Sequence, residues 1–419
     1  MGKLELKVIE KLRMGTPPER GAELYSVGYG ALVEGVERHH LSALEGFGKI
    51  RFVCGSYGSG KTHFFRLLRE AAFRNGSFIS NVELGANEAP LNKFEKVFYA
   101  IIRNIATAEQ FESEALDDAM PFGFVVRRAL RTLGGLPSSS EDAITFGVVE
   151  KAGAALMLNR AIDIDFKKMI LEYWKTYVGD NPDPAASEQR REEVLQWFAG
   201  EGSIGQYRTR FGVSKMISRE NAKLMLRSLS AFIRQAGAKG LTILFDEAQQ
   251  SYSAMRRSSL RDAHINLRSL IDEIEHLPGM FLVYATTPDF YSDPNYGIVV
   301  YGALSTRIGQ PKDHAPKATD IVWNLDVIVN EDKDFVEAAA KIRKVYEKAY
   351  DADNARLPSM DAIVKFVREI RSKQGRFSRV SFWRILVECV VLHLDVCREG
   401  GKPNPTEIYE DVIDRLRDE

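Results

Sequence analysis

The stretch Gly55-Ser56-Tyr57-Gly58-Ser59-Gly60-Lys61-Thr62 decides the fold, because it matches the pattern G-x-x-x-x-G-K-[ST] without a mismatch. Its glycines leave room for main-chain N–H groups to wrap around an anion, where larger side chains would obstruct them. A helix that starts here adds further N–H groups and a favourable dipole. In this pattern Lys61 reaches the β- and γ-phosphates, and the Thr62 hydroxyl is a ligand of Mg²⁺. The stretch therefore predicts a site for a nucleoside triphosphate.

The residues on both sides of this phosphate loop supply the context that the motif requires. Ile50–Cys54 (IRFVC) is typical of a short buried strand, and residues 63–73 continue as a helix. The alternative is a glycine-rich turn that matches the pattern by chance. Such a turn would not need a buried strand before it and a helix after it. A dinucleotide-binding G-x-G-x-x-G does not fit, because no third glycine follows Gly58 and Gly60 in register.

A pair of acids follows a second buried strand. Leu241–Phe245 (LTILF) is a continuous apolar run, as expected of a strand covered on both faces, and it ends in Asp246-Glu247. Carboxylates at the C-terminal tip of such a strand lie on the ligand edge of the sheet. There Asp246 would hold Mg²⁺ or its water, and Glu247 would act as general base on the attacking water. The alternative is an ordinary acidic loop. Beside the phosphate loop, the adjacent acids predict hydrolysis rather than binding alone.

Polar residues also follow the next buried strand, Phe281–Ala285 (FLVYA). We favour Thr286 as the residue that fixes the attacking water between Glu247 and the γ-phosphate, with Thr287 as the next candidate. The alternative is a Thr-Thr-Pro turn that makes no contact with the nucleotide.

Strands that alternate with helices predict an α/β fold with a parallel sheet. Ser77–Leu84 (SFISNVEL) and Ile321–Val329 (IVWNLDVIV) are two further strand candidates. We expect an N-terminal helical segment at 1–45, a core at 46–330 with a helical insertion at about 110–217, and a four-helix C-terminal domain at 331–419.

Composition excludes several classes of protein. The chain has 57 Lys+Arg against 58 Asp+Glu in 419 residues, and 45% of its residues are hydrophobic, so it is neither disordered nor a histone-like polycation. Its 3 cysteines lack the spacing of a zinc site or a disulfide framework. No apolar run is long enough to cross a membrane, and the charged first residues lack a signal-peptide core. We expect a cytoplasmic protein without a membrane partner.

Together, these motifs resemble the AAA+ branch of P-loop ATPases, in which the phosphate loop is Walker A and the acid pair is Walker B. The chain is also similar to the ATP-binding proteins of bacterial BREX phage-defence systems, of BrxD-like type. The segments that carry this likeness are ERGAELYSVG (19–28), GKIRFVCGSYGSGKTHFFRLLRE (48–70), SNVELGANEAPLNKFEKVFYAIIRNI (80–105) and LFDEAQ (244–249).

The resemblance implies a P-loop, AAA+-like core closed by a helical lid, with ATP and Mg²⁺ as cofactors. Beyond Gly55–Thr62 and Asp246, we include His63 in the predicted nucleotide-binding set. Arg307 stands where the family places its arginine finger, which reaches the γ-phosphate of a neighbouring subunit in a homo-oligomer. Arg379, or alternatively Arg376, stands in the sensor-2 region of the lid, where the spacing from Gly375 is one residue longer than usual. The family also places the segment around 20–28 near adenine.

A group of arginines follows the acid pair: Arg256, Arg257, Arg261 and Arg268. They would suit contact with DNA phosphates without sequence specificity, although a solvated helix face is the commoner reason for such charges. The chain ends shortly after the predicted lid helices, so we expect no added domain that reads base sequence.

The leading functional hypothesis is an ATPase that uses Mg-ATP hydrolysis to rearrange a defence complex with other defence-system proteins, with DNA as a further candidate partner. The alternative is a nucleotide-gated signalling or scaffold protein that hydrolyses ATP slowly and uses it to set an assembly state. A small-molecule kinase is a third reading, which the base position of Glu247 disfavours.

Overall fold

The computed structural model describes residues 2–85, 89–112, 121–137, 143–178, 183–246, 255–328, 331–351, 356–373 and 382–418. None of the helices in these ranges is both long and apolar enough to span a bilayer.

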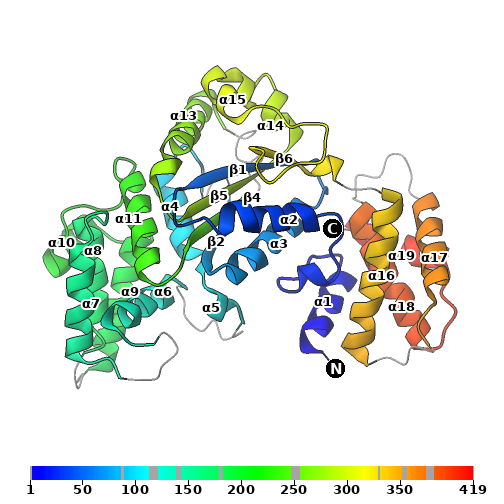
Figure 1. Cartoon of the computed structure of the whole chain (residues 1–419), viewed down its shortest axis with the longest axis horizontal. Helices are drawn as coiled ribbons and strands as arrows, with labels where there is room; N and C mark the ends of the chain where they lie inside the picture. Colours follow the sequence, from blue (N-terminus) through cyan, green and yellow to red (C-terminus); the bar gives the residue numbers. More distant parts are fainter. Residues whose placement is uncertain are drawn as a thin grey trace. The chain divides into compact units, whose positions relative to one another are not determined.

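Within the described residues, six strands form one sheet in the order β3-β2-β4-β5-β1-β6 (Figure 1). Their bounds are β1 Lys49–Cys54, β2 Ser77–Glu83, β3 Ile105–Ala106, β4 Gly240–Asp246, β5 Met280–Thr286 and β6 Val322–Asn324. β4 pairs in parallel with both β2 and β5, whereas the short β3 runs antiparallel to β2. The predicted α/β class with a mainly parallel sheet is confirmed.

The last strand is shorter than the sequence predicts. β6 ends at Asn324, whose side-chain oxygen accepts a hydrogen bond of 3.2 Å from the N–H of Asp326. This local bond favours the 3₁₀ turn Leu325–Val327 over continued strand. Within the predicted strand Ile321–Val329, residues 322–324 form a strand and residues 325–327 form a turn.

The two strands β4 and β5 are covered because they have almost no polar face. Every residue of β5 is buried, and in β4 only Asp246 is partly exposed. The helices adjacent to the strands in the chain are α2 Gly30–Val36, α3 Lys61–Arg74, α4 Phe94–Arg103, α11 Ala222–Gln235, α13 Arg257–Glu273, α14 Pro288–Ser292 and α15 Gly302–Ile308.

Contacts between residues divide the chain into two compact units, and each unit is made of segments that are not consecutive in the sequence. The first unit contains residues 1–35, 53–70 and 311–419, and the second contains residues 36–52 and 71–310. The phosphate loop thus belongs to the first unit, and the acid-bearing strand β4 to the second. The domain boundaries expected at residues 45 and 330 stay predictions.

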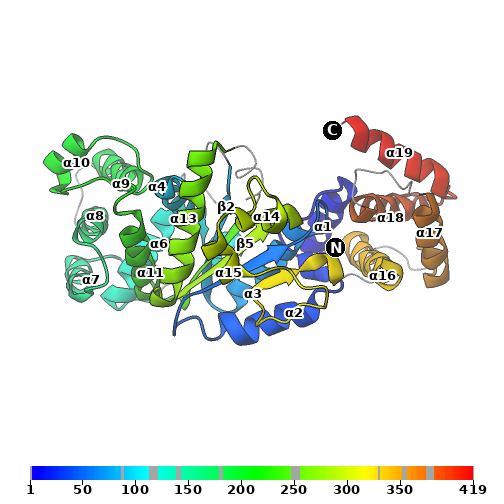
Figure 2. The ribbon, with the colours of Figure 1, turned by 90° about the horizontal axis from the view of Figure 1, so that it is seen from above.

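In the first unit, the N-terminal helix packs with the C-terminal helices. These elements are α1 Lys3–Arg13, α16 Glu331–Tyr350, α17 Met360–Lys373, α18 Phe382–Arg398 and α19 Pro405–Asp418 (Figure 2). Val8, Ile9 and Leu12 of α1 are buried in the same apolar core as the C-terminal helices. Arg13 extends the contact by donating from Nε to Asp395 at 2.9 Å. The sequence predicts four helices in residues 331–419. It does not predict that α1 packs into the core of these helices.

In the second unit, the region expected as a helical insertion has helices joined by irregular segments, and no strand, among its described residues from 121 to 217. The helices are α6 Pro121–Gly134, α7 Phe146–Leu158, α8 Ile164–Lys175, α9 Pro184–Phe198 and α10 Ile204–Phe211, after the short α5 Ala108–Glu112. Phe166 makes edge-to-face contacts with both Phe198 and Phe232, at centroid distances of 4.8 and 5.6 Å. Because Phe232 lies on α11, this aromatic packing joins the insertion to α11 in one core.

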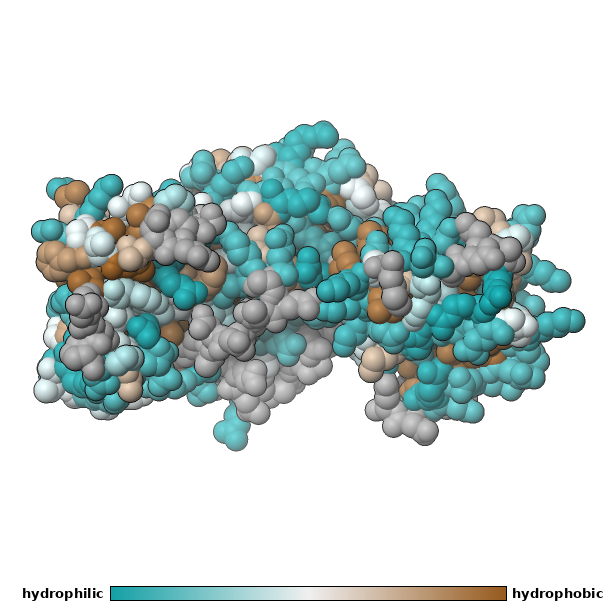
Figure 3. Space-filling view, turned by 90° about the horizontal axis from the view of Figure 1, so that it is seen from below, coloured by the Kyte–Doolittle hydropathy of each residue, from teal (hydrophilic) through white to brown (hydrophobic). Residues whose placement is uncertain are grey.

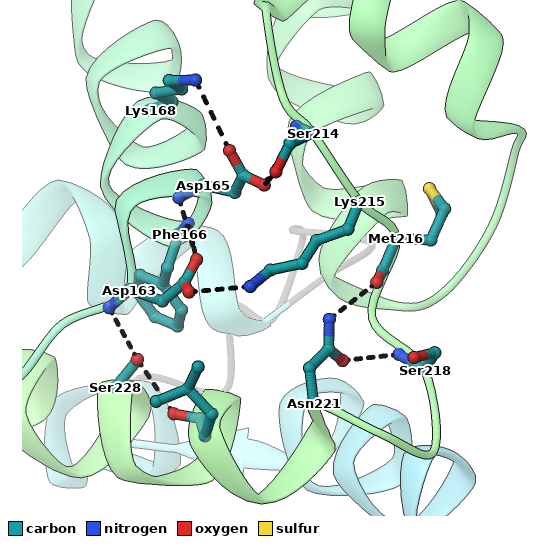
Figure 4. A network of polar contacts seen from close by, with 11 residues as sticks. Asp163, Asp165, Phe166, Lys168, Ser214, Lys215, Met216, Ser218, Asn221 and Ser228 are labelled. Atoms are coloured by element: carbon teal, nitrogen blue, oxygen red, sulfur yellow. Dashed lines mark hydrogen bonds and ion pairs between the residues drawn. The ribbon is translucent and has the colours of Figure 1, made fainter.

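Two aspartates join α8 to the segment that leads into α11 (Figure 4). Asp165 is fully buried and accepts hydrogen bonds from the Ser214 N–H at 3.0 Å and the Ser214 hydroxyl at 2.5 Å. Asp163 caps α8 and forms an ion pair with Lys215 at 3.1 Å. These contacts fix the polypeptide between α10 and α11 where it is irregular.

We expect Asp165→Ala to lower the free energy of unfolding by about 3 kcal/mol, because it leaves the Ser214 amide without its acceptor inside the protein. The matched control is Asp183→Ala, since Asp183 is an exposed cap that accepts from the Ala186 N–H at 3.0 Å. Its loss should cost about 1 kcal/mol. Urea titrations of both variants measure the difference, and equal effects would contradict the assigned role of Asp165.

Apolar side chains are exposed on the insertion, where brown residues gather at the left-hand end of Figure 3. Leu158 is 82% exposed at the end of α7, Met157 next to it is 45% exposed, and Ile164 at the start of α8 is 48% exposed. Neighbouring apolar residues that remain in water are typical of a surface that contacts another protein.

Candidate functional site

The phosphate loop lies between β1 and α3, as its sequence predicts. Phe52 and Val53 are fully buried, so the loop starts from a fixed strand end. Gly58 and Gly60 have φ angles of +75° and +90°, which favour glycine. A Cβ on Gly55 would lie 2.2 Å from the Ser59 hydroxyl oxygen. All three glycines are therefore required by the conformation that the loop adopts.

Main-chain groups of the loop are held by hydrogen bonds within it. The Ser59 N–H donates to the Ser56 carbonyl at 3.1 Å. The Lys61 ammonium donates to the carbonyls of Gly55 and Ser56 at 2.7 and 2.8 Å. In this conformation Lys61 lies over the first turn of the loop, and the Thr62 hydroxyl is on an exposed residue at the start of α3.

Two residues that the sequence analysis missed contact the loop from elsewhere in the first unit. The Tyr29 hydroxyl donates to the Ser59 carbonyl at 3.1 Å. The Asp326 carboxylate accepts from the Ser56 N–H, at 3.0 Å to each oxygen, and from the Ser56 hydroxyl at 2.8 Å. No motif marks these positions, because they lie 30 and 270 residues from their partners.

His63, the last residue of the predicted nucleotide-binding set in this loop, contacts the N-terminal segment. Its Nδ1 shares a hydrogen bond of 3.1 Å with the Tyr25 hydroxyl, and the two rings lie 5.0 Å apart. Burial lowers the pKa of His63 to about 4. The imidazole is therefore neutral at physiological pH and adds no positive charge beside the loop.

In the second unit, polar residues occur at the carboxyl ends of two adjacent parallel strands. Asp246 ends β4, in register with Glu83 of β2, and its carbonyl accepts from the Leu84 N–H at 2.9 Å. Thr286 ends β5. Since β4 and β5 are parallel, Asp246 and Thr286 lie at the same edge of the sheet. Glu247, the predicted base, lies outside the described residues.

The two threonines after β5 differ in their surroundings. The Thr286 side chain is buried, and its hydroxyl shares a hydrogen bond of 2.9 Å with the Tyr291 hydroxyl. The Thr287 hydroxyl is also buried, and within the described part of the chain it has no hydrogen-bond partner. Thr286 is thus held within its own unit, and the choice between the two threonines stays a prediction.

Arg307 lies on α15 and is paired within its own chain. Its Nε donates to Asp272 of α13, and its Nη1 donates to the Ala303 carbonyl at 2.7 Å. The hydrogen bond from Arg307 holds the pKa of Asp272 below its usual range. Arg379 and Arg376, the two candidates for the lid sensor, lie outside the described residues.

The arginines proposed for DNA differ in exposure. Arg256, Arg257 and Arg261 are exposed at the start of α13, whereas Arg268 donates to the Tyr301 hydroxyl at 2.9 Å and is partly buried. The Arg268 side chain is still 40% exposed, but among the described residues it differs from the first three in being paired with Tyr301 and Asp272.

The structure thus brings Gly55–Thr62 together with Tyr29, Asp326 and His63 in the first unit. Asp246, Thr286 and Arg307 belong to the second unit. No group of three or more His, Cys, Asp or Glu side chains suited to a metal ion occurs among the described residues.

A protein-family model described as "BREX system ATP-binding protein BrxC/D" matches residues 3–412 of the chain. Comparison with curated proteins and with solved structures gives no match. The match extends over both compact units and the helical insertion.

Proposed function

The chain belongs to the BrxC/D family of BREX system ATP-binding proteins, and from this premise we propose that it is an AAA+-type ATPase. In this proposal, hydrolysis of Mg-ATP drives rearrangement of a BREX defence complex. The family supports an ATP-binding role in BREX defence, and the catalytic and mechanical parts are our own inference.

The observation that carries the proposal is the geometry of the phosphate loop. Gly58 and Gly60 adopt positive φ angles, the loop follows a buried strand, and Lys61 stands at the first position of a 14-residue helix. A loop of this shape directs main-chain N–H groups and the positive end of the helix dipole toward one anion. Lys61 would then leave the carbonyls that it now contacts and bind the β- and γ-phosphates.

Magnesium fits the oxygen donors that the chain offers. Thr62 presents an exposed hydroxyl after the loop, and Asp246 presents a partly exposed carboxylate at a strand end. Hydroxyl, carboxylate and phosphate oxygens are the ligands that Mg²⁺ prefers. When bound, the ion would neutralise charge on the phosphates. Glu247 would take the proton of the attacking water, and Thr286 would orient that water.

We further propose that the enzyme works as a homo-oligomer in which Arg307 reaches the γ-phosphate of a neighbouring subunit. Arg379, or else Arg376, would contact phosphate from the helical lid, residues 331–419. The segment around 20–28 would contact adenine. Contact with DNA would use the exposed Arg256, Arg257 and Arg261 and would follow charge rather than base sequence.

One observation favours the second candidate, a slow nucleotide-gated switch. Arg307 is already paired with Asp272 of its own chain and has only part of its side chain in water. An arginine held in this way would not assist hydrolysis until Asp272 released it. The two candidates predict different dependences of the ATPase rate on protein concentration.

The test is the ATPase rate per chain across a wide range of protein concentration, with and without DNA. For the oligomeric ATPase we expect a steep rise with concentration. Arg307→Ala should remove that rise and lower turnover at least about tenfold, because an arginine finger contributes about 10³–10⁵ in rate in related chemistry.

The matched control for this variant is Arg219→Ala. Arg219 is also a surface arginine, paired with Asp262 of α13 at 3.2 Å, and no role at the nucleotide is proposed for it. A low rate that is independent of concentration and unchanged in Arg307→Ala would favour the switch.

A further inference from the structure

We propose that Tyr29 and Asp326 are positioning residues that hold the two ends of the phosphate loop in its anion-binding conformation. The proposal rests on the proposed function, because it assigns these residues to the binding of nucleotide phosphates. Asp326 binds Ser56, the second residue of the loop, and Tyr29 binds Ser59 near its end. Both belong to the same compact unit as the loop.

The Tyr29 side chain is held in place by packing. Its ring is 6% exposed and lies 5.4 Å from the ring of Phe64 on α3. Burial raises the pKa of Tyr29, so its hydroxyl stays protonated and can donate to the Ser59 carbonyl. A Cβ on Gly60 would lie 2.9 Å from the tyrosine oxygen. The hydroxyl and the glycine are therefore fitted to each other, and the loop cannot move here without breaking this contact.

Asp326 is positioned by the end of β6. The Asn324 side chain accepts from the Asp326 N–H at 3.2 Å and donates to the Lys312 carbonyl at 3.0 Å. The carboxylate then meets both the N–H and the hydroxyl of Ser56. A hydrogen bond to a charged acceptor is stronger than one between neutral groups. Because Asp326 is exposed, water weakens this bond, and we expect a smaller contribution from Asp326 than from Tyr29.

The segment that carries Tyr29 also contacts the first C-terminal helix. The Lys341 ammonium of α16 donates to the Ser26 carbonyl at 2.7 Å. Gly28 has a φ angle of +79°, and a Cβ there would lie 3.4 Å from a carboxylate oxygen of Asp334, also on α16. Residues 26–29 thus connect the phosphate loop to α16.

If Tyr29 and Asp326 position the loop, their variants should lose affinity selectively, which a merely destabilised variant would not do. Tyr29 and Asp326 act on the part of the site that would hold the β- and γ-phosphates. Weaker positioning should therefore reduce affinity for ATP and ADP and leave affinity for AMP unchanged. An unstable or misfolded variant would lose affinity for all three nucleotides.

The experiment is a competition titration of ATP, ADP and AMP against a fluorescent ATP analogue, with Tyr29→Phe and the wild-type chain. This variant keeps the buried ring and removes only the hydroxyl. We expect about fivefold weaker binding of ATP and ADP, the loss that one hydrogen bond of ordinary strength gives. The matched control is Tyr207→Phe, because the buried Tyr207 also donates to a main-chain carbonyl, that of Glu201 at 3.0 Å.

A second variant, Asp326→Ala, changes an exposed residue and therefore tests the proposal without disturbing the core. At about 0.3 M salt, where charge repulsion with the phosphates is screened, we expect about threefold weaker ATP binding. Asp293→Ala is the control, since Asp293 accepts from the N–H groups of Asn295 and Tyr296 at 2.7 and 3.2 Å in another loop.

The outcomes separate the two proposals. If the wild-type chain binds no ATP, the proposed function is wrong, and the positioning role falls with it. If the wild-type chain binds ATP and Tyr29→Phe and Asp326→Ala bind it equally well, the positioning role alone is overturned. Equal losses for ATP and AMP, or the same loss in Tyr207→Phe, would also overturn it.

Discussion

Lys61→Ala is expected to weaken ATP binding by at least about 100-fold, because it removes the positive charge that the phosphate loop directs at the β- and γ-phosphates. Loss of one partner from a hydrogen-bonded charge pair costs about 2–5 kcal/mol, and each 1.4 kcal/mol is a factor of ten in the dissociation constant. Titration calorimetry with Mg-ATP measures the change. The proposed function depends on this residue more than on any other.

Lys49→Ala is the matched control for this prediction. Lys49 lies at the start of β1 and its ammonium also donates to a main-chain carbonyl, that of His39. The melting temperature of each variant must be recorded, because Lys61 itself bonds to two loop carbonyls in the structure. If a folded Lys61→Ala protein bound ATP nearly as well as the wild-type chain, the assignment of the phosphate loop to the nucleotide site would be wrong.

Much of the sheet and of the loop follows from local sequence. The strands LTILF and FLVYA are largely apolar runs that end in polar residues, so their burial and their carboxyl ends can be predicted without tertiary information. The loop glycines are also a local requirement, since φ angles of +75° and +90° at Gly58 and Gly60 exclude most other residues. Local requirements leave a visible pattern in the chain.

Contacts between distant segments leave no such pattern. Tyr29 and Asp326 are ordinary residues in the sequence, and only the fold places them beside Ser59 and Ser56. Helix α1 has the same amphipathic pattern whether it packs on its neighbours in the chain or on α16 and α18. The shortened strand β6 depends on one side chain, Asn324, which turns the polypeptide before an otherwise suitable apolar run ends.

Glu247→Gln is expected to keep ATP binding and to lower the rate of hydrolysis by about 10²–10⁴-fold, the range typical for loss of a general base. Glutamine has nearly the shape of glutamate and still accepts a hydrogen bond, but it cannot take a proton from water. The place of Glu247 in the chain, directly after Asp246 at the end of β4, motivates the prediction. Mg-ATP titration together with single-turnover hydrolysis separates binding from chemistry.

Glu83→Gln is the control that makes this test specific, because Glu83 ends the neighbouring strand β2 in register with Asp246 and is exposed. If an acid near this sheet edge acted only through its charge, both variants would slow hydrolysis to a similar extent. A base acts through one proton at one position, so only Glu247→Gln should do so. Retained hydrolysis in Glu247→Gln would assign the proton transfer to another group.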